Sequence, residues 1–167
     1  WDFQWVDARR PLVPRGPDGS FDNDMIIPPA NIITHRDRHW IYYGGSNERH
    51  GASKREYGIG GATLRLDGMI CLTAKDRPGT VMTKPFKLAG DELQVNVRGD
   101  EFLVEVLDQQ GEPIPGFSAN EATKYEHTDD LRLTPTWKKR LATLKGRVIR
   151  LRFHLKNANL YSFQLPE

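Results

Sequence analysis

The sequence predicts an all-β protein, an antiparallel β-sandwich of jelly-roll type preceded by an incomplete sheet unit. Three observations support this fold class. Short apolar runs recur at intervals of roughly ten residues, a spacing typical of sandwiches and barrels. Gly, Asp and Pro separate many of the runs, as turns require. Within several runs apolar and polar residues alternate, which indicates strands with one face on a core and one face in water.

The predicted strands fall into two groups. In the first part of the chain the runs are short and lie at 25–27, 31–34 and 40–43. In the second part they follow in regular succession, at 62–66, 69–73, 81–86, 93–97, 102–107, 148–155 and 160–165. The clearest alternation joins Ile149, Leu151, Phe153 and Leu155. One helical turn is indicated around 138–144, and it is too short to form a helical layer.

A domain boundary is predicted at the glycine-rich residues 58–61. Residues 1–57 would then form the incomplete sheet unit, and residues 58–167 would form the self-contained sandwich. A sheet of three short strands is marginally stable unless it packs on something else. Because the chain begins at Trp1 with no Met, we expect it to be part of a longer polypeptide.

Composition excludes several classes of function. The 167 residues suit one domain, or one domain with a piece of another. The formal net charge is +2 and the basic residues are scattered, so we expect no nucleic-acid partner. No apolar run approaches the roughly 20 residues that cross a bilayer, so we expect no membrane partner. The single cysteine, Cys71, cannot form an internal disulfide and is interpreted as a small buried hydrophobe.

An aromatic strand that runs into a polar loop is the strongest functional signal in the chain. Alternation along residues 40–43 sends Trp40 and Tyr42 to one face of the strand. Aromatic rings can cover the apolar face of a sugar while charged and amide groups bind its hydroxyls. The candidate polar groups are Asn47, Glu48, Arg49 and His50. The alternative is that the rings belong to the core and the loop is a solvated turn.

Several strings in this chain resemble the five-bladed β-propeller glycoside hydrolases, which include families 32 and 43 and their relatives. Residues 14–22, 25–29 and 40–45 are similar to one propeller blade, ending in the string Trp-Ile-Tyr-Tyr-Gly-Gly. Residues 59–68 resemble the exit from a last blade into a C-terminal β-sandwich, and residues 148–163 resemble the closing strands of such a sandwich.

The resemblance implies that residues 1–57 form a partial propeller blade. It also implies that the chain is a carbohydrate-associated accessory region of a glycoside hydrolase-like protein, whose sandwich supports the propeller, binds polysaccharide, or does both. The implied partners are an oligo- or polysaccharide and the remaining blades, in a longer chain or in a partner chain. The implied location is extracellular or periplasmic. The alternative function is a structural or protein-interaction module that binds no sugar.

Asp22 is the candidate catalytic residue that the resemblance implies. Glycoside hydrolysis needs two carboxyl groups that flank the scissile bond. Asp22 matches the Phe-Asp blade motif, and a second carboxylate would come from blades outside this chain. We therefore expect that the chain alone is not a complete glycosidase. The alternative is that Asp22 only stabilises the turn that enters a strand.

No cofactor is predicted, although one calcium site is left open. Residues 18–24 space oxygen-bearing side chains at alternate positions, as calcium loops do. They lack the central Gly and the closing Glu of an EF-hand, so an ordinary Asx-rich turn is the competing interpretation. His35 and His39 have no further ligand nearby, so a zinc site is not predicted.

The sandwich offers a second possible sugar surface at Trp137 and Tyr161. Both residues fall in or beside the later loops and closing strands, where carbohydrate-binding modules carry aromatic platforms. For Trp137 the alternative is that the ring closes one end of the sandwich, because large aromatic side chains usually anchor cores.

Overall fold

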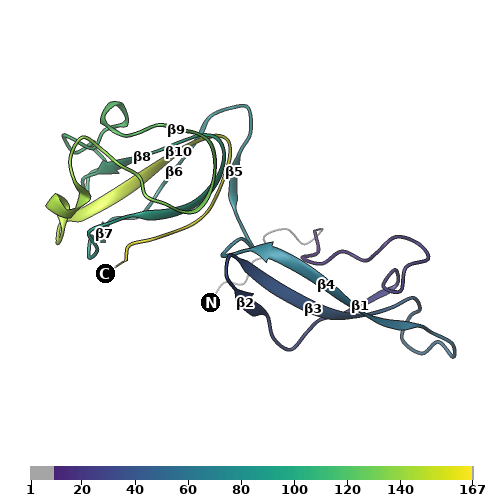
Figure 1. Cartoon of the computed structure of the whole chain (residues 1–167). Coiled ribbons are helices and arrows are strands. Elements are labelled where there is room, and N and C mark those ends of the chain that lie inside the picture. Colours follow the sequence, from purple (N-terminus) through teal and green to yellow (C-terminus); the bar gives the residue numbers. More distant parts are fainter. Residues whose placement is uncertain (1–9, 167) are drawn as a thin grey trace. The chain divides into compact units, whose positions relative to one another are not determined.

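The computed structural model describes residues 10–166, and the chain divides between Met69 and Ile70 into two compact units (Figure 1). Every strand pairing is antiparallel, and the described residues contain no α-helix. The predicted all-β class is therefore confirmed.

The first unit is a small sheet built around one central strand. Its strands are β1 (Met25–Ile27), β2 (Ile33–His35), β3 (Arg38–Ser46) and β4 (Tyr57–Arg65). β4 pairs with β3 along its whole length, so β1 and β2 lie end to end along the other edge of β3. Pro28 and Pro29 follow β1, and since proline has no N–H to donate, the pairing stops there.

The predicted boundary after residue 57 was wrong, because the glycines at 58–61 belong to β4 rather than to a linker. Glycine is needed there for close packing with aromatic rings. A Cβ atom at Gly58 would collide with the Phe21 ring, and one at Gly60 would collide with the Tyr43 ring. The change of unit comes later, between Met69 and Ile70.

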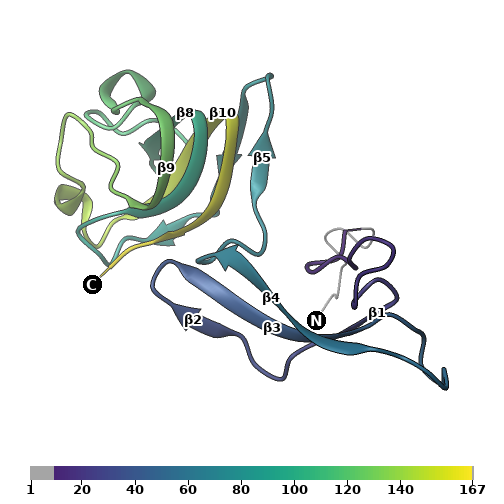
Figure 2. The ribbon, with the colours of Figure 1, turned by 45° about the vertical axis from the view of Figure 1, so that its right-hand side comes forward.

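The second unit is a curled sheet of six strands. The strands are β5 (Leu72–Ala74), β6 (Gly79–Met82), β7 (Phe86–Lys87), β8 (Gln94–Leu107), β9 (Tyr125–Leu133) and β10 (Val148–Gln164). β10 lies in the middle, with β8 on one edge and β5, β6 and β7 in succession on the other; β9 pairs with the far edge of β8. Figure 2 shows β8, β9 and β10 curving together. Two 3₁₀ turns complete the unit, η1 (Ala119–Glu121) and η2 (Leu141–Leu144).

The core of the second unit lies on the inner face of the curled sheet. The alternating residues Ile149, Leu151, Phe153 and Leu155 are all at most 4% exposed, as their pattern predicts. They pack with inward residues of β8 and with side chains from the loops, including Leu88, Leu93, Val95, Val97, Phe102, Val104, Val106, Ile114, Phe117, Leu141 and Leu144. The residues of β10 that alternate with these four therefore face outward, away from the core.

Three expectations about the second unit need correction. The predicted turn at Gly99 lies inside β8, and the predicted gap at 156–159 lies inside β10. These two sites face each other, since Gly99 pairs with Ala158, and a Cβ atom at Gly99 would collide with that residue's backbone. β9 was not predicted at all, because polar residues occupy most of its positions.

Candidate functional site

β3 carries the aromatic side chains that the sequence singles out. Its residues alternate between the two faces of the first sheet. Trp40 and Tyr42 lie on one face, with 37% and 53% of their surface exposed. Ile41 lies on the opposite face and is 3% exposed, and Tyr43 on that face is half-buried. The rings of Trp40 and Tyr42 are therefore accessible from solvent, as a binding role requires.

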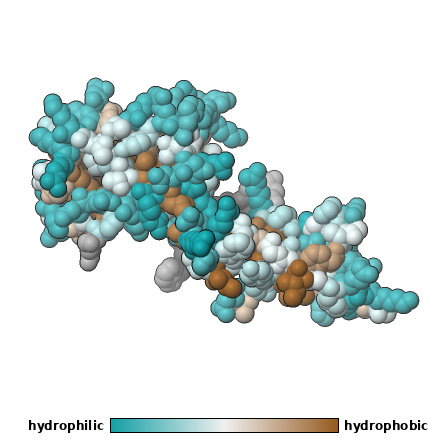
Figure 3. Space-filling view, viewed as in Figure 1, coloured by the Kyte–Doolittle hydropathy of each residue, from teal (hydrophilic) through white to brown (hydrophobic). Residues whose placement is uncertain are grey.

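Aliphatic side chains of the neighbouring strands share the face of Trp40 and Tyr42, because residues directly opposite each other in an antiparallel pair point the same way. Ile33 lies opposite Trp40, and Ile27 and Ile59 lie opposite Gly44. These isoleucines are between 43% and 84% exposed. Figure 3 shows such apolar side chains at the surface of the first unit. We call this set the aromatic face: Ile27, Ile33, Trp40, Tyr42 and Ile59.

Polar groups and an open position adjoin the two rings. Thr63 lies opposite Trp40, and its hydroxyl accepts a hydrogen bond of 3.3 Å from Arg38 Nη1. Gly61 lies opposite Tyr42 and has no side chain to cover that ring. The Trp40 ring therefore has hydrogen-bonding groups beside it, and the Tyr42 ring has an open position beside it.

The predicted polar loop is organised within the first unit. The Asn47 side-chain oxygen accepts a hydrogen bond of 2.8 Å from the Glu56 N–H, and the Asn47 N–H donates to the Glu56 carbonyl. Asn47 thereby closes the loop. Arg49 Nε lies 3.7 Å from Asp24 Oδ1. The other members of the loop prediction are exposed, namely Glu48 and His50.

The loop lies at the end of β3, away from the rings. Tyr42 and Asn47 are five positions apart along the chain, which corresponds to about 17 Å at the usual rise of a strand. The structure therefore brings Trp40 and Tyr42 together and does not bring the loop side chains into the same hollow. A ligand that touched both would have to be an extended chain.

Asp22 is buried against the other face of the first sheet. Its side chain accepts hydrogen bonds from the Ser20 hydroxyl at 2.7 Å and from the Tyr43 hydroxyl at 2.8 Å, and only 6% of the residue is exposed. These hydrogen bonds, from Ser20 first and Tyr43 second, outweigh desolvation and hold the pKa of Asp22 below its ordinary value. Gly16 leaves room for the carboxyl group, since a Cβ there would collide with Asp22 Oδ1. This is the placement of a carboxylate that organises a turn.

We expect Asp22→Asn to loosen the first unit at neutral pH and to have little effect in acid. Because the pKa of Asp22 is lowered, its ionised form stabilises the folded state above the ordinary aspartate pKa of about 3.9, and this contribution is lost as the pH falls through the folded-state value. Amide hydrogen exchange in β3 at the two pH values measures the effect. Tyr43→Phe, which removes one of the two hydrogen bonds, should give a smaller change at neutral pH. Unchanged exchange in Asp22→Asn would contradict the assignment.

Two of the carboxylates that the calcium hypothesis uses are engaged with other groups. Asp22 is bound as described above, and Asp24 Oδ1 lies 3.6 Å from Arg15 and 3.7 Å from Arg49. Among residues 10–166, no group of three His, Cys, Asp or Glu side chains is placed to hold a metal ion. The contacts at 18–24 are those of a turn.

Trp137 is a core anchor of the second unit. Its indole N–H donates a hydrogen bond of 2.7 Å to the Val104 carbonyl, and its ring centroid lies 5.9 Å from that of Phe117. Part of the ring lines a hollow of about 260 Å³ beside Thr136 and Leu141. The alternative in which Trp137 closes the sandwich therefore describes its contacts better than the platform prediction.

Tyr161 lies in β10 and is half-buried. It lines a mainly apolar hollow of about 360 Å³, together with Leu72, Val81 and Phe163. Trp137 lines a different hollow, so the structure does not bring the two predicted platform residues onto one surface.

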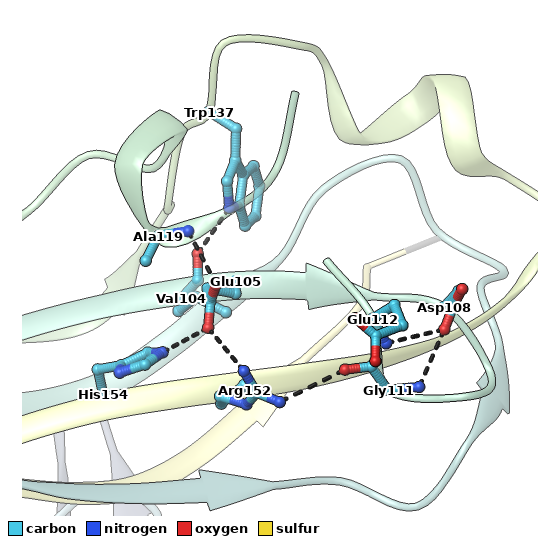
Figure 4. A network of polar contacts seen from close by, with 9 residues as sticks. All are labelled: Val104, Glu105, Asp108, Gly111, Glu112, Ala119, Trp137, Arg152 and His154. Carbon is cyan, nitrogen blue, oxygen red and sulfur yellow. Dashed lines mark hydrogen bonds and ion pairs between the residues drawn. The ribbon is translucent and has the colours of Figure 1, made fainter. Parts of the chain in front are cut away.

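The sequence analysis missed a buried carboxylate in β8 that binds an arginine and a histidine of β10 (Figure 4). Glu105 is 5% exposed. Its Oε2 lies 2.7 Å from His154 Nε2 and 3.2 Å from Arg152 Nη1, and its Oε1 accepts a hydrogen bond of 2.9 Å from the Ala119 N–H. Burial raises the pKa of Glu105, but the bonds to His154 and Ala119 and the charges of His154 and Arg152 outweigh it and lower the pKa overall.

A tight turn after β8 extends this network. Asp108 Oδ1 accepts hydrogen bonds of 2.9–3.0 Å from the N–H groups of Gln110, Gly111 and Glu112. The turn directs the Gly111 carbonyl toward Arg152, whose Nη2 donates to it at 3.4 Å. The Arg152 guanidinium thereby binds Glu105 through Nη1 and the Gly111 carbonyl through Nη2.

A second charged cluster lies further along the same outer face. Glu101 in β8 accepts hydrogen bonds from Lys124 at 2.7 Å and from Lys156 in β10 at 2.6 Å. These two contacts, in that order, lower the pKa of Glu101 to about 2. Beside the cluster is a small cavity of about 140 Å³. The signal available in the sequence was the alternation of Arg152, His154 and Lys156, but only the strand register shows which carboxylates they meet.

No protein-family model, curated protein or solved structure matches this chain. No helix in the described part of the chain has the length and apolar character to span a membrane.

Proposed function

We propose that this chain is a carbohydrate-associated accessory region of a glycoside hydrolase-like protein, and that the rings of Trp40 and Tyr42 on the aromatic face of its first unit contact oligo- or polysaccharide. In this proposal the first unit is part of a propeller blade, the second unit supports the propeller, and the whole works outside the cell or in the periplasm. The catalytic carboxylates would lie in other blades, because Asp22 is buried and hydrogen-bonded within its own unit.

The observation that carries the proposal is the exposure of two neighbouring aromatic rings on one face of a sheet. Trp40 and Tyr42 are 37% and 53% exposed although both are large amphipathic side chains. Aromatic rings of this kind bind an apolar surface while their polar atoms and neighbours bind hydroxyl groups. The Arg38 guanidinium and the Thr63 hydroxyl supply such neighbours beside Trp40.

A glycan array with the wild type and Trp40→Ala tests the proposal. We expect the wild type to bind at least one class of polysaccharide and Trp40→Ala to bind it at least tenfold more weakly, because a ring contact worth about 1.4 kcal/mol would be lost. Circular dichroism of the variant checks that the sheet is intact.

Ile59→Ala is the matched control for the ring contact. Ile59 belongs to the aromatic face and is the most exposed of its members at 84%, but it has no ring. A saccharide site should tolerate this substitution, with affinity within about twofold of the wild type. Equal binding by wild type and Trp40→Ala, or binding by neither, removes the sugar hypothesis for this face.

A second candidate function, a protein-interaction module, is favoured by the isoleucines of the aromatic face. Ile27, Ile33 and Ile59 are exposed beside the rings, and contiguous exposed apolar patches mark interfaces as often as ligand sites. If this function is the correct one, the array shows no binding. Ile59→Ala then affects association with the protein's partner at least as much as a ring substitution does.

A further inference from the structure

The cavity beside Glu101 lies on the outer face of the second unit, where three strands meet. His154 in β10 pairs with Thr80 in β6 and with Leu103 in β8, and Lys156 pairs with Glu101. Directly opposed residues share a face, so these side chains surround one spot. Lys124, which directly precedes β9, completes the polar rim.

The lining of this cavity combines apolar walls with a polar rim. Pro78 and Leu103 supply apolar side chains to the walls. The rim offers both kinds of hydrogen-bonding group: the Glu101 carboxylate accepts, whereas the ammonium groups of Lys124 and Lys156 donate. Each ammonium group has three N–H donors, and the contact with Glu101 uses one of those on Lys156. Donors and acceptors side by side can bind adjacent hydroxyl groups, which both donate and accept.

Negative and positive charges around the cavity balance. This balance favours a neutral ligand over a charged one. Among the Glu, Lys and Arg side chains of this network, Glu101, Glu105 and Glu126 stand against Lys124, Arg152 and Lys156, three against three, and His154 adds a charge only when it is protonated. A site with no net charge gives no long-range attraction to an anion. A neutral ligand rich in hydroxyl groups fits this balance better than a carboxylate or phosphate does.

The volume limits the ligand to a small group. Complete ligand pockets in proteins hold roughly 300–1,000 Å³, and this cavity holds about 140 Å³. It is therefore large enough for one sugar ring or its end, and too small for several rings enclosed together.

We propose that this cavity binds a single neutral sugar residue, whose adjacent hydroxyl groups contact Glu101 and Lys156 and whose apolar face contacts Leu103. The inference extends the proposed carbohydrate association to a second site, in a different unit from the aromatic face. Buried Glu105 positions the His154 side of the cavity through its 2.7 Å contact with Nε2.

The test is an NMR titration of the full-length chain, labelled with ¹⁵N, with methyl pyranosides of glucose, galactose, mannose and xylose. We expect at least one glycoside to shift the amide signals of β6, β8 and β10 around the cavity, with a dissociation constant in the millimolar range. Glucuronic acid, the charged counterpart of glucose, should not bind more tightly than the neutral sugars.

Lys156→Met removes the rim donor and keeps most of the side-chain volume, so we expect at least a tenfold loss of affinity for the glycoside that binds. Lys145→Met is the control, because Lys145 pairs with Asp91 away from the cavity lining and should leave the affinity unchanged. The proposal is overturned if no glycoside shifts these signals, if glucuronic acid binds more tightly, or if Lys156→Met binds as the wild type does.

The two sites can fail separately. Trp40→Ala should leave the shifts in the second unit unchanged, because Trp40 lies in the first unit. Array binding without shifts around the cavity would keep the proposed function and remove this site. Shifts around the cavity without array binding would support this site and contradict the proposed role of the aromatic face.

Discussion

Phe153→Ala should lower the free energy of unfolding of the second unit by about 4 kcal/mol. Phe153 is 1% exposed and lies on the inner face of β10, between Val81 of β6 and Val104 of β8. Its ring stacks on Phe102 with a centroid distance of 6.3 Å and an interplanar angle of 23°. Removing the ring loses its burial and leaves a cavity that strands on both sides prevent from collapsing.

Urea denaturation of the full chain, followed by tryptophan fluorescence, measures this loss. Phe163→Ala is the matched control, because Phe163 touches the same ring at 5.3 Å but is 40% exposed. We expect the control to cost about 1 kcal/mol, the usual contribution of a partly exposed aromatic pair. Equal losses in the two variants would show that Phe153 does not occupy the centre of the core.

Glu105→Ala should cost the second unit about 2–3 kcal/mol at neutral pH. Removing one partner of a buried ion pair leaves the other partner uncompensated, which costs about 3–5 kcal/mol when both are fully buried. Here Arg152 and His154 are each 31% exposed, so water screens part of the loss and the lower figure applies. The Ala119 N–H also loses its acceptor.

The contribution of Glu105 to the free energy of unfolding should decrease as the pH falls. Its pKa is lower in the folded protein than its ordinary value of about 4.3, so the ionised carboxylate stabilises the fold above that pH. This stabilisation disappears as the pH falls through the folded-state pKa. The difference between wild type and Glu105→Gln should therefore be largest near neutrality and shrink in acid.

Denaturation midpoints of both Glu105 variants at several pH values check these expectations, with Glu112→Ala as the control. Glu112 is exposed and bonds to Asp108 only through its backbone N–H and carbonyl groups, so its replacement should change the free energy of unfolding by less than about 0.5 kcal/mol. A pH-independent difference for Glu105→Gln would mean that the charge of Glu105 does not stabilise the fold.

The sequence allowed the inner strands to be predicted, because alternation reports burial directly. Ile149 and Phe153 belong to such a pattern, and both are buried. The breaks predicted between 97 and 102 and between 155 and 160 were wrong, and Gly99 and Asn157 fall within them. They lie inside long strands, where Asn157 adopts a positive φ of 46° and Gly99 accommodates the backbone of the facing strand.

The two candidate sites differ in how far the sequence could reveal them. The exposure of Trp40 and Tyr42 on one face follows from alternation within a single strand. The contacts of Glu105 and Glu101 depend on the pairing of β8 with β10, which joins residues about fifty positions apart in the chain. No local pattern carries that information, so these clusters emerged only with the strand register.

The polar residues that prevented the prediction of β9 also affect how this edge of the sheet can pair with other molecules. β9 stands at the end of the described strand order and carries Glu126, Asp129 and Asp130. Glu126 contacts Lys124 and Asp129 contacts Arg98, so this edge carries charged pairs, and charged side chains on an edge strand disfavour its pairing with a second molecule. The second unit is thereby protected at this edge against growing, chain by chain, into fibrous aggregates.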